Sequence, residues 1–250
     1  MRIPVLVINF KTYRTSYGQS GLSIAKSAEK VALETGLNIV IAPPLLETSL
    51  IVKNVGIDVY AQHAEPLYYG AYTGHTPIEA LRDVGVRGVL VNHSENQTDL
   101  KSIIRISEIA RSMGLGVIAC SDSTGLAEII ARHAMPDAIA LEPPELIGSG
   151  IAVSKARPEI IVEGVRAIKQ VSKHMLWNTE QVPRDIAVLA GAGISSREDV
   201  ARAIELGAEG VLVASAIMLS KSPESVIMDF AQSMLKAWDE RRAGSSDKKA

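Results

Sequence analysis

Residues 138–150 read Ala-Ile-Ala-Leu-Glu-Pro-Pro-Glu-Leu-Ile-Gly-Ser-Gly and combine three features in one short stretch. An apolar run, Ala138–Leu141, ends in the carboxylate of Glu142. Two prolines follow, which stiffen the chain and prevent both a continuing strand and an immediate helix. The last three residues, Gly148-Ser149-Gly150, can bring backbone amides close to an anion. The pattern predicts a strand-end base beneath a movable lid, although an exposed loop with an incidental glutamate would look the same.

Short apolar runs of the same kind recur along the chain, each followed by a stretch with helical character. In residues 18–35, apolar side chains repeat at helical spacing, and Gly36 follows as a stop signal. The expected strands are Ile3–Ile8, Asn38–Ala42, Ile57–Ala61, Gly88–Val91, Leu115–Cys120, Ala138–Leu141, Ile186–Leu189 and Gly210–Val213. The helices are expected near residues 18–35, 46–54, 77–84, 99–113, 123–134, 157–174, 196–206 and 223–241.

This alternation of strands and helices predicts an α/β fold with a parallel sheet. Continuous runs rich in Val and Ile, without polar alternation, are typical of strands buried on both faces. Eight strand–helix units in 250 residues match a single closed (β/α)8 TIM barrel. The alternative, a doubly wound open sheet, usually carries Gly-x-Gly-x-x-Gly after its first strand, whereas residues 9–13 read Asn-Phe-Lys-Thr-Tyr.

Length and composition fit one large domain or two small ones. Because the sequence shows no interdomain linker, we expect one domain that spans residues 1–242. Of the 250 residues, 47% are apolar, which is enough for a sizeable core. The polar tail, residues 243–250, is expected to be disordered. The polar segment at residues 173–183 is interpreted as a surface insertion rather than a domain boundary.

Charge and cysteine content narrow the partners and the compartment. A formal net charge of −2 gives no reason to expect nucleic acid or a membrane as a partner. The sequence shows no signal-peptide pattern and no apolar run long enough to span a bilayer. Cys120 is the only cysteine, which excludes an internal disulfide, and we expect it to be packed and inert. These features predict a cytoplasmic protein.

Candidate site residues are those at the carboxyl ends of the strands, where barrels of this kind carry their chemistry. Lys11, His93 and Glu142 follow the first, fourth and sixth strands. The segments Gly191–Gly193 and Ala214-Ser215 follow the last two strands, the usual phosphate site of such barrels. Alone, each could be a solvated lysine, a structural histidine, an incidental glutamate or a turn glycine. Together they predict an enzyme with a pocket for a phosphate dianion.

The segment after His93 has two interpretations. Residues 94–97 fit a capping box with Ser94 as the N-cap, which would place His93 just before a helix start. Thr98 or Asp99 could instead cap the longer helix. Glu95 is the weakest candidate for a functional residue, because it could simply begin a helix.

The strand-end segments described above, together with Val153–Lys155, resemble the triosephosphate isomerases, specifically the shorter archaeal type. Where the longer bacterial and eukaryotic forms carry a lid tryptophan and paired glycines, this chain has Pro-Pro-Glu-Leu, Gly-Ala-Gly-Ile and Ala-Ser, as the archaeal type does. Asn96 and Gln97 replace the family's arginines after His-Ser-Glu, a departure that bears on surface and assembly rather than chemistry. The matching segments are Ile8–Lys11, Asn92–Glu95, Leu141–Gly150, Val153–Lys155, Gly191–Ile194 and Ala214-Ser215.

The resemblance implies an isomerase that interconverts D-glyceraldehyde 3-phosphate and dihydroxyacetone phosphate through an enediol(ate), in glycolysis and gluconeogenesis. Glu142 would be the base, His93 the electrophile and Lys11 the electrostatic partner; this family is itself the standard example of a base beside a neutral histidine. The reaction involves no redox change, so no cofactor and no metal are expected. The substrate site would comprise Asn9, Lys11, Ile147, Gly193, Ala214 and Ser215.

The resemblance also implies an assembly. The loop after the third strand, with Tyr72–Gly74 near its tip, would contact a neighbouring subunit, and a homotetramer is favoured over a dimer. One alternative function is another phosphate-binding (β/α)8 enzyme, such as a sugar-phosphate epimerase, lyase or synthase, which would share only the phosphate pocket. The other is a non-catalytic barrel, in which the residues at the catalytic positions would have decayed.

Overall fold

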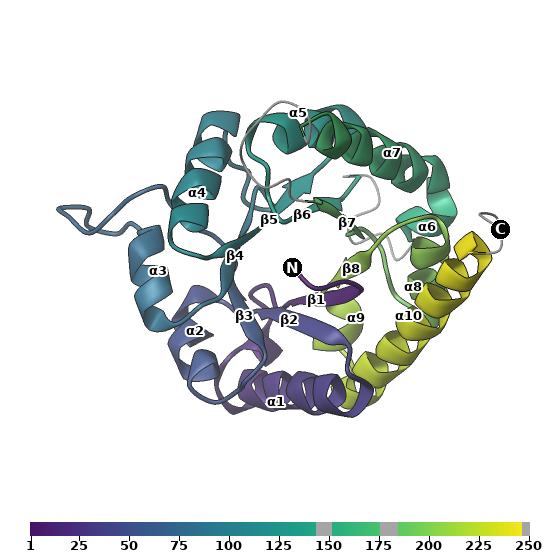
Figure 1. The fold of residues 1–250 in the computed structure, drawn as a ribbon. Helices are drawn as coiled ribbons and strands as arrows, with labels where there is room; N and C mark the ends of the chain where they lie inside the picture. The colour runs from purple at the N-terminus through teal and green to yellow at the C-terminus, as the bar shows by residue number, and fades with distance from the viewer. Residues whose placement is uncertain (144–151, 176–184, 247–250) are drawn as a thin grey trace.

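The computed structural model describes the chain except residues 144–151, 176–184 and 247–250. Its parallel strands form one closed barrel in sequence order, and the first strand pairs with the last. Helices surround the strands as an outer ring (Figure 1). The predicted (β/α)8 architecture is confirmed. The doubly wound alternative is wrong, because the strands that the structure describes close into a barrel.

The strands lie close to the predicted ranges. They are β1 (Val5–Asn9), β2 (Asn38–Ala42), β3 (Asp58–Ala61), β4 (Gly88–Val91), β5 (Gly116–Ser121), β6 (Ala138–Leu141), β7 (Ala187–Ala190) and β8 (Gly210–Val213). The strand β1 begins at Val5 rather than at Ile3. Pro4 has no amide hydrogen to give to a ladder, whereas the Val5 N–H donates to the Glu209 carbonyl at 3.1 Å.

The expected helices are all present, and short ones occur between them. The expected ones are α1 (Gly18–Thr35), α2 (Leu45–Val52), α3 (Ile78–Val84), α4 (Leu100–Ser112), α5 (Thr124–His133), α7 (Pro158–Met175), α8 (Arg197–Glu205) and α10 (Pro223–Ser246). The short helices η1 (Arg14–Ser16), α6 (Val153–Ala156) and α9 (Ser215–Met218) span too few residues to leave a periodic pattern in the sequence.

The C-terminal helix is longer than predicted. We expected α10 to end near Arg241, but it continues to Ser246, so residues 243–246 of the predicted tail are helical. The remaining tail residues, 247–250, lie outside the described part of the chain. Most of the segment at 173–183 also lies outside it.

Helix caps show which of the two interpretations after His93 holds. At α4, the Asp99 side chain accepts a hydrogen bond from the Ser102 N–H at 3.0 Å, so Asp99 is the N-cap. The capping box predicted at Ser94 is therefore wrong, and the alternative with Asp99 is confirmed. Residues 94 and 95 form a tight turn instead, in which the Asn96 N–H donates to the His93 carbonyl at 2.8 Å.

The core has an inner part within the barrel and an outer part between strands and helices. Both faces of the strands are buried, which explains their continuously apolar sequences. The ring of Tyr60 occupies the barrel interior beside Gly88 and Gly116, where an added Cβ would collide with it. The inner cluster comprises Val5, Val7, Val40, Ala42, Tyr60, Leu90, Ile118, Cys120, Ala138, Ala140, Ala187, Leu189 and Leu212.

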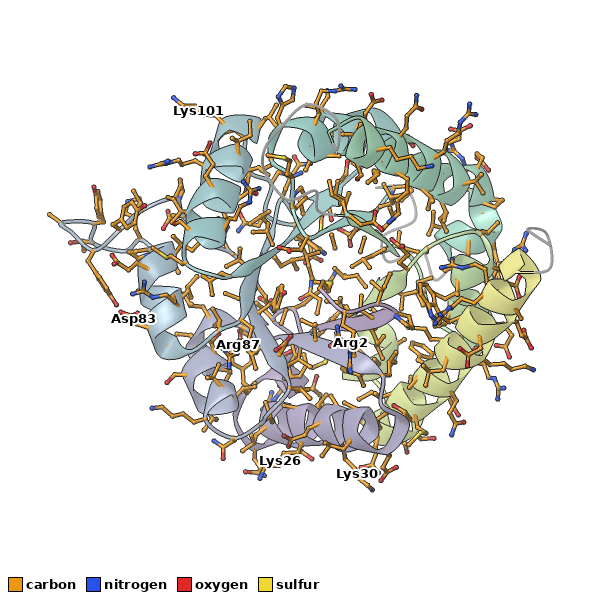
Figure 2. All side chains as sticks on the ribbon, viewed as in Figure 1. Arg2, Lys26, Lys30, Asp83, Arg87 and Lys101 are labelled. Atoms are coloured by element: carbon orange, nitrogen blue, oxygen red, sulfur yellow. The ribbon has the colours of Figure 1, made fainter. Side chains whose placement is uncertain are left out.

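The outer faces of the helices carry charged side chains, with exposed leucines among them on α1 and α2. Lys26 and Lys30 on α1 and Lys101 on α4 point away from the barrel (Figure 2). Among the helices that the structure describes, none is long and apolar enough to cross a membrane.

Candidate active site

The loop after β1 holds Lys11 in an unusual backbone conformation. Lys11 has a φ of 47°, a left-handed conformation that costs energy in a residue with a Cβ. The Asn9 side-chain oxygen accepts a hydrogen bond from the Lys11 N–H at 2.9 Å. The Gln62 side-chain amide, from the end of β3, donates to the Lys11 carbonyl at 3.2 Å and to the Ala42 carbonyl at 2.9 Å. Neighbouring strand ends therefore fix the conformation of this loop.

His93 is positioned by the turn that follows β4. The residue before it, Asn92, has a φ of 58°, and its side chain bonds the Cys120 carbonyl and the Thr98 N–H, both at 2.9 Å. The His93 Nδ1 accepts a hydrogen bond from the Glu95 N–H at 3.2 Å. Because Nδ1 is an acceptor, we assign the proton of the neutral imidazole to Nε2.

Burial keeps the His93 ring neutral. Its side chain is 7% exposed, and this burial, aided by the positive charge of Lys11 and opposed by Glu95, lowers the pKa of His93 below its usual range. The ring can therefore donate a hydrogen bond from Nε2 without carrying a charge.

Glu95 joins the two groups. Its Oε1 lies 2.7 Å from the Lys11 Nζ, an ion pair between residues far apart in the sequence. Its Oε2 lies 3.7 Å from the His93 Nδ1, which is too far for a hydrogen bond. From the sequence, Glu95 is the weakest candidate for a functional residue, yet in the structure its carboxylate makes the ion pair that orients Lys11. The sequence signal that could have indicated this role is the position of Glu95 directly after His93-Ser94.

Glu142 is buried at the end of β6, opposite the histidine. Its Oε1 lies 3.5 Å from the His93 Nε2, and its side chain is 3% exposed. Within the described part of the chain, Oε2 has no hydrogen-bond partner. Burial raises the pKa of Glu142 to about 7, although a hydrogen bond from Cys120 and the charge of Lys11 act in the opposite direction. A carboxylate with this pKa is suited to accept and return a proton near neutral pH.

Glycine at position 191 makes room for this carboxylate. A Cβ built on Gly191 would lie 2.5 Å from the Glu142 Cγ and 3.0 Å from its Oε1. The sequence predicts only a phosphate-binding role for residues 191–193. The steric role of Gly191 follows from the neighbouring positions of β6 and β7 in the barrel.

Two cavities open around these groups. The smaller, of about 140 Å³, is lined by Lys11, His93, Glu142, residues 191–195 and residues 212–215. Gly193 has a φ of 69° there, and α9 begins at Ser215. The larger, of about 460 Å³, shares Lys11 and His93 and extends past Asn9 and Glu95 to the exposed side chains of Leu45 and Leu46.

The predicted site residues thus meet at one end of the barrel. Lys11, His93, Glu142, Gly193, Ala214 and Ser215 line the small cavity, and Asn9 lines the adjoining one. Ile147 lies outside the described residues. In the described part of the chain, no group of three or more His, Cys, Asp or Glu side chains is arranged to hold a metal ion.

Comparison with known proteins agrees with this geometry. A family model described as triosephosphate isomerase matches residues 4–232. The chain belongs to the triosephosphate isomerase family. It is 45% identical to the triosephosphate isomerase of Methanocaldococcus jannaschii over 225 residues, covering 90% of this chain and 97% of that protein. It is 41% identical to that of Metallosphaera sedula over 243 residues, or 96% of this chain and 100% of the relative.

Membership in this family decides between the functions considered from the sequence. A third relative, the triosephosphate isomerase of Pyrobaculum calidifontis, is 43% identical over 237 residues. The match covers 95% of this chain and 99% of that protein. The prediction of a triosephosphate isomerase is confirmed. It is favoured over another phosphate-binding barrel enzyme and over a non-catalytic barrel.

Proposed function

We propose that this chain interconverts D-glyceraldehyde 3-phosphate and dihydroxyacetone phosphate, with Glu142 as the base and His93 as the electrophile. The observation that carries these roles is the 3.5 Å approach of the Glu142 Oε1 to the His93 Nε2 in a buried site. Both side chains line the small cavity, so a substrate bound there would meet a proton acceptor at one atom and an N–H donor at the neighbouring atom.

The proton transfers follow from this placement. Glu142 removes a proton from the carbon next to the carbonyl, and negative charge develops on the carbonyl oxygen. The neutral His93 donates a hydrogen bond to that oxygen from Nε2, and the Lys11 ammonium stabilises the charge. Glu142 then returns the proton to the neighbouring carbon, and the hydroxyl proton passes from the hydroxyl oxygen to the former carbonyl oxygen, a transfer that the Nε2–H of His93 can mediate, so that the carbonyl and the hydroxyl exchange places. No electrons leave the substrate, so the reaction needs neither a nicotinamide nor a metal.

Lys11 depends on Glu95 for its position. The 2.7 Å ion pair holds the ammonium at the rim, where it lines both cavities. An ammonium on a free four-carbon chain would sample many positions, and ordering it costs conformational entropy. We therefore assign Glu95 a positioning role.

The small cavity is the proposed phosphate site. Gly193, Ala214 and Ser215 have small side chains or none, so their backbone can approach a dianion closely, and Asn9 supports Lys11 from the other side. Ile147 is proposed as a further substrate contact, within a lid formed by residues 143–150. Closure of such a lid excludes water from the intermediate, and this family is the standard example of it.

Assembly into a homotetramer, or alternatively a dimer, is proposed from the loop between β3 and α3. This loop projects from the ring of helices (Figure 1), and Tyr68, Tyr69 and Tyr72 on it are 46%, 59% and 46% exposed. The exposed side chains of Leu45 and Leu46, at the edge of the large cavity, offer a second apolar surface for a neighbouring copy. A monomer in sedimentation velocity at micromolar concentration would contradict this assembly. We place the enzyme in the cytoplasm, in glycolysis and gluconeogenesis.

A coupled assay tests the reaction and the base together. Purified protein is given glyceraldehyde 3-phosphate, and dihydroxyacetone phosphate is followed, for the unmodified chain, Glu142→Gln and the control Glu163→Gln. Glu163 is exposed on α7. We expect turnover in the unmodified chain and the control, and loss of about 1,000-fold or more in Glu142→Gln. Equal turnover in all three proteins would move the base elsewhere.

A further inference from the structure

The first turn of α8 contains a buried carboxylate with more partners than a helix cap requires. Asp199 is 1% exposed, and its Oδ2 accepts hydrogen bonds from the Ser196 N–H at 2.9 Å and from both the N–H and the hydroxyl of Ser195 at 3.1 Å. The Ser196 contacts form a capping box at the start of α8. The bonds to Ser195 extend this anchoring into the loop after β7.

The other oxygen of the same carboxylate reaches a different element. Its Oδ1 lies 2.6 Å from the Nζ of Lys155, on the short helix α6. The Lys155 side chain is 56% exposed, whereas that of Asp199 is 1% exposed. Water thus hydrates only the lysine side of this ion pair. The negative charge of the buried carboxylate is stabilised by its direct protein partners instead.

The helix α6 is attached to the loop after β7 at further points. The Val153 N–H donates to the Ala192 carbonyl at 3.0 Å, and the Ser154 hydroxyl donates to the Asp199 carbonyl at 3.4 Å. Ala192 and Ser195 line the small cavity beside Glu142. The loop at residues 191–196 is therefore anchored, on the side away from the cavity, by the hydrogen bonds and the ion pair of Asp199.

We propose that Asp199 and Lys155 are positioning residues for the phosphate end of the substrate. Neither side chain lines the small cavity, so both act through the loop at residues 191–196. Their ion pair holds this loop where Gly193, with a φ of 69°, presents backbone to the cavity. The inference rests on the proposed function in one respect, namely that the small cavity binds phosphate.

Variants of Lys155 test the proposal, because this side chain is half exposed and Asp199 keeps its hydrogen bonds from Ser195 and Ser196 when the lysine is replaced. Lys155→Met removes the cation, and Lys155→Arg keeps it. Lys169→Met is the matched control, because Lys169 pairs with Asp185 at 2.7 Å and with the mostly buried Glu209 at 2.8 Å, and none of the three lines the small cavity. For each variant we would measure kcat and KM, and the Kd of inorganic phosphate by calorimetry. Turnover of D-glyceraldehyde, which lacks the phosphate, would be measured alongside.

The expected result is specific to phosphate. Lys155→Met raises the KM and the Kd of inorganic phosphate by about fivefold, the equivalent of losing one half-exposed ion pair. Its kcat/KM for D-glyceraldehyde stays unchanged, and Lys155→Arg behaves like the unmodified enzyme. Equal losses on both substrates, the same rise in KM in Lys169→Met, or an unchanged phosphate Kd would overturn the proposal. An unmodified chain that binds phosphate without turnover would refute the proposed function instead. The phosphate Kd of the variants would still test the positioning role of Asp199 and Lys155.

Discussion

Glu142, the proposed base, should contribute less to the stability of the protein at high pH than at low pH. The pKa of Glu142 is about 7 in the folded chain, against an ordinary value of 4.5. Because the folded state holds this proton more tightly than the unfolded state, stability contributed by the protonated group is lost as pH rises from about 4.5 to about 7. A difference of about 2.5 pKa units corresponds to about 3 kcal/mol in the free energy of unfolding.

The perturbation that isolates this contribution is Glu142→Gln, which keeps the size of the side chain and removes its titration. We expect the variant to gain about 3 kcal/mol over the unmodified protein on going from pH 4.5 to pH 8. The amide is buried as well, so its own desolvation changes the offset between the two proteins but not the pH dependence of their difference.

Urea unfolding at a series of pH values measures this difference. One protein concentration is used throughout, because the proposed subunit association would add to the apparent stability. Glu163→Gln, an exposed change on α7, serves as the control and should give a difference that does not vary with pH. A difference between Glu142→Gln and the unmodified protein that stays constant within about 1 kcal/mol would refute the assignment of a raised pKa to Glu142.

Two further predictions concern the same carboxylate. The acidic limb of the kcat/KM profile should fall with an apparent pKa of about 7, because Glu142 must be ionised to act as a base, and a profile falling only near pH 6, where a substrate phosphate titrates, would contradict this. Gly191→Ala should lower kcat by about 100-fold, because its Cβ displaces the Glu142 carboxylate. Steady-state kinetics checks it, with Gly125→Ala as the control, since a Cβ at Gly125 meets no atom within 4 Å. Similar kcat values in the two variants would remove the steric role of Gly191.

The sequence was sufficient for the order of the strands and for the rim that carries the site. Each strand is a buried apolar run, and the barrel rule places residues that follow such runs, including Lys11, His93 and Glu142, at one end. What the sequence could not supply were relations between distant positions. The ion pair between Lys11 and Glu95 and the space that Gly191 leaves for Glu142 depend on how strand ends face one another across the barrel.

Local signals near His93 were ambiguous for a different reason. Ser94 and Asp99 are both good N-cap residues with suitable residues after them, so propensity alone did not separate them. Two polar bonds decide the outcome in the structure: the Asn92 side chain accepts from the Thr98 N–H, and Asp99 accepts from the Ser102 N–H. The turn at residues 94 and 95 is thereby left to orient the imidazole instead of beginning a helix.

The burial of the single thiol gives this protein a built-in probe of its own opening. Cys120 is 1% exposed inside the barrel, and burial raises the pKa of its thiol well above the usual range. A thiol-specific reagent can react there only when the packing that covers the sulfur opens, because the side chain is buried. The rate of modification therefore reports how often the structure around Cys120 opens under native conditions, without any introduced label.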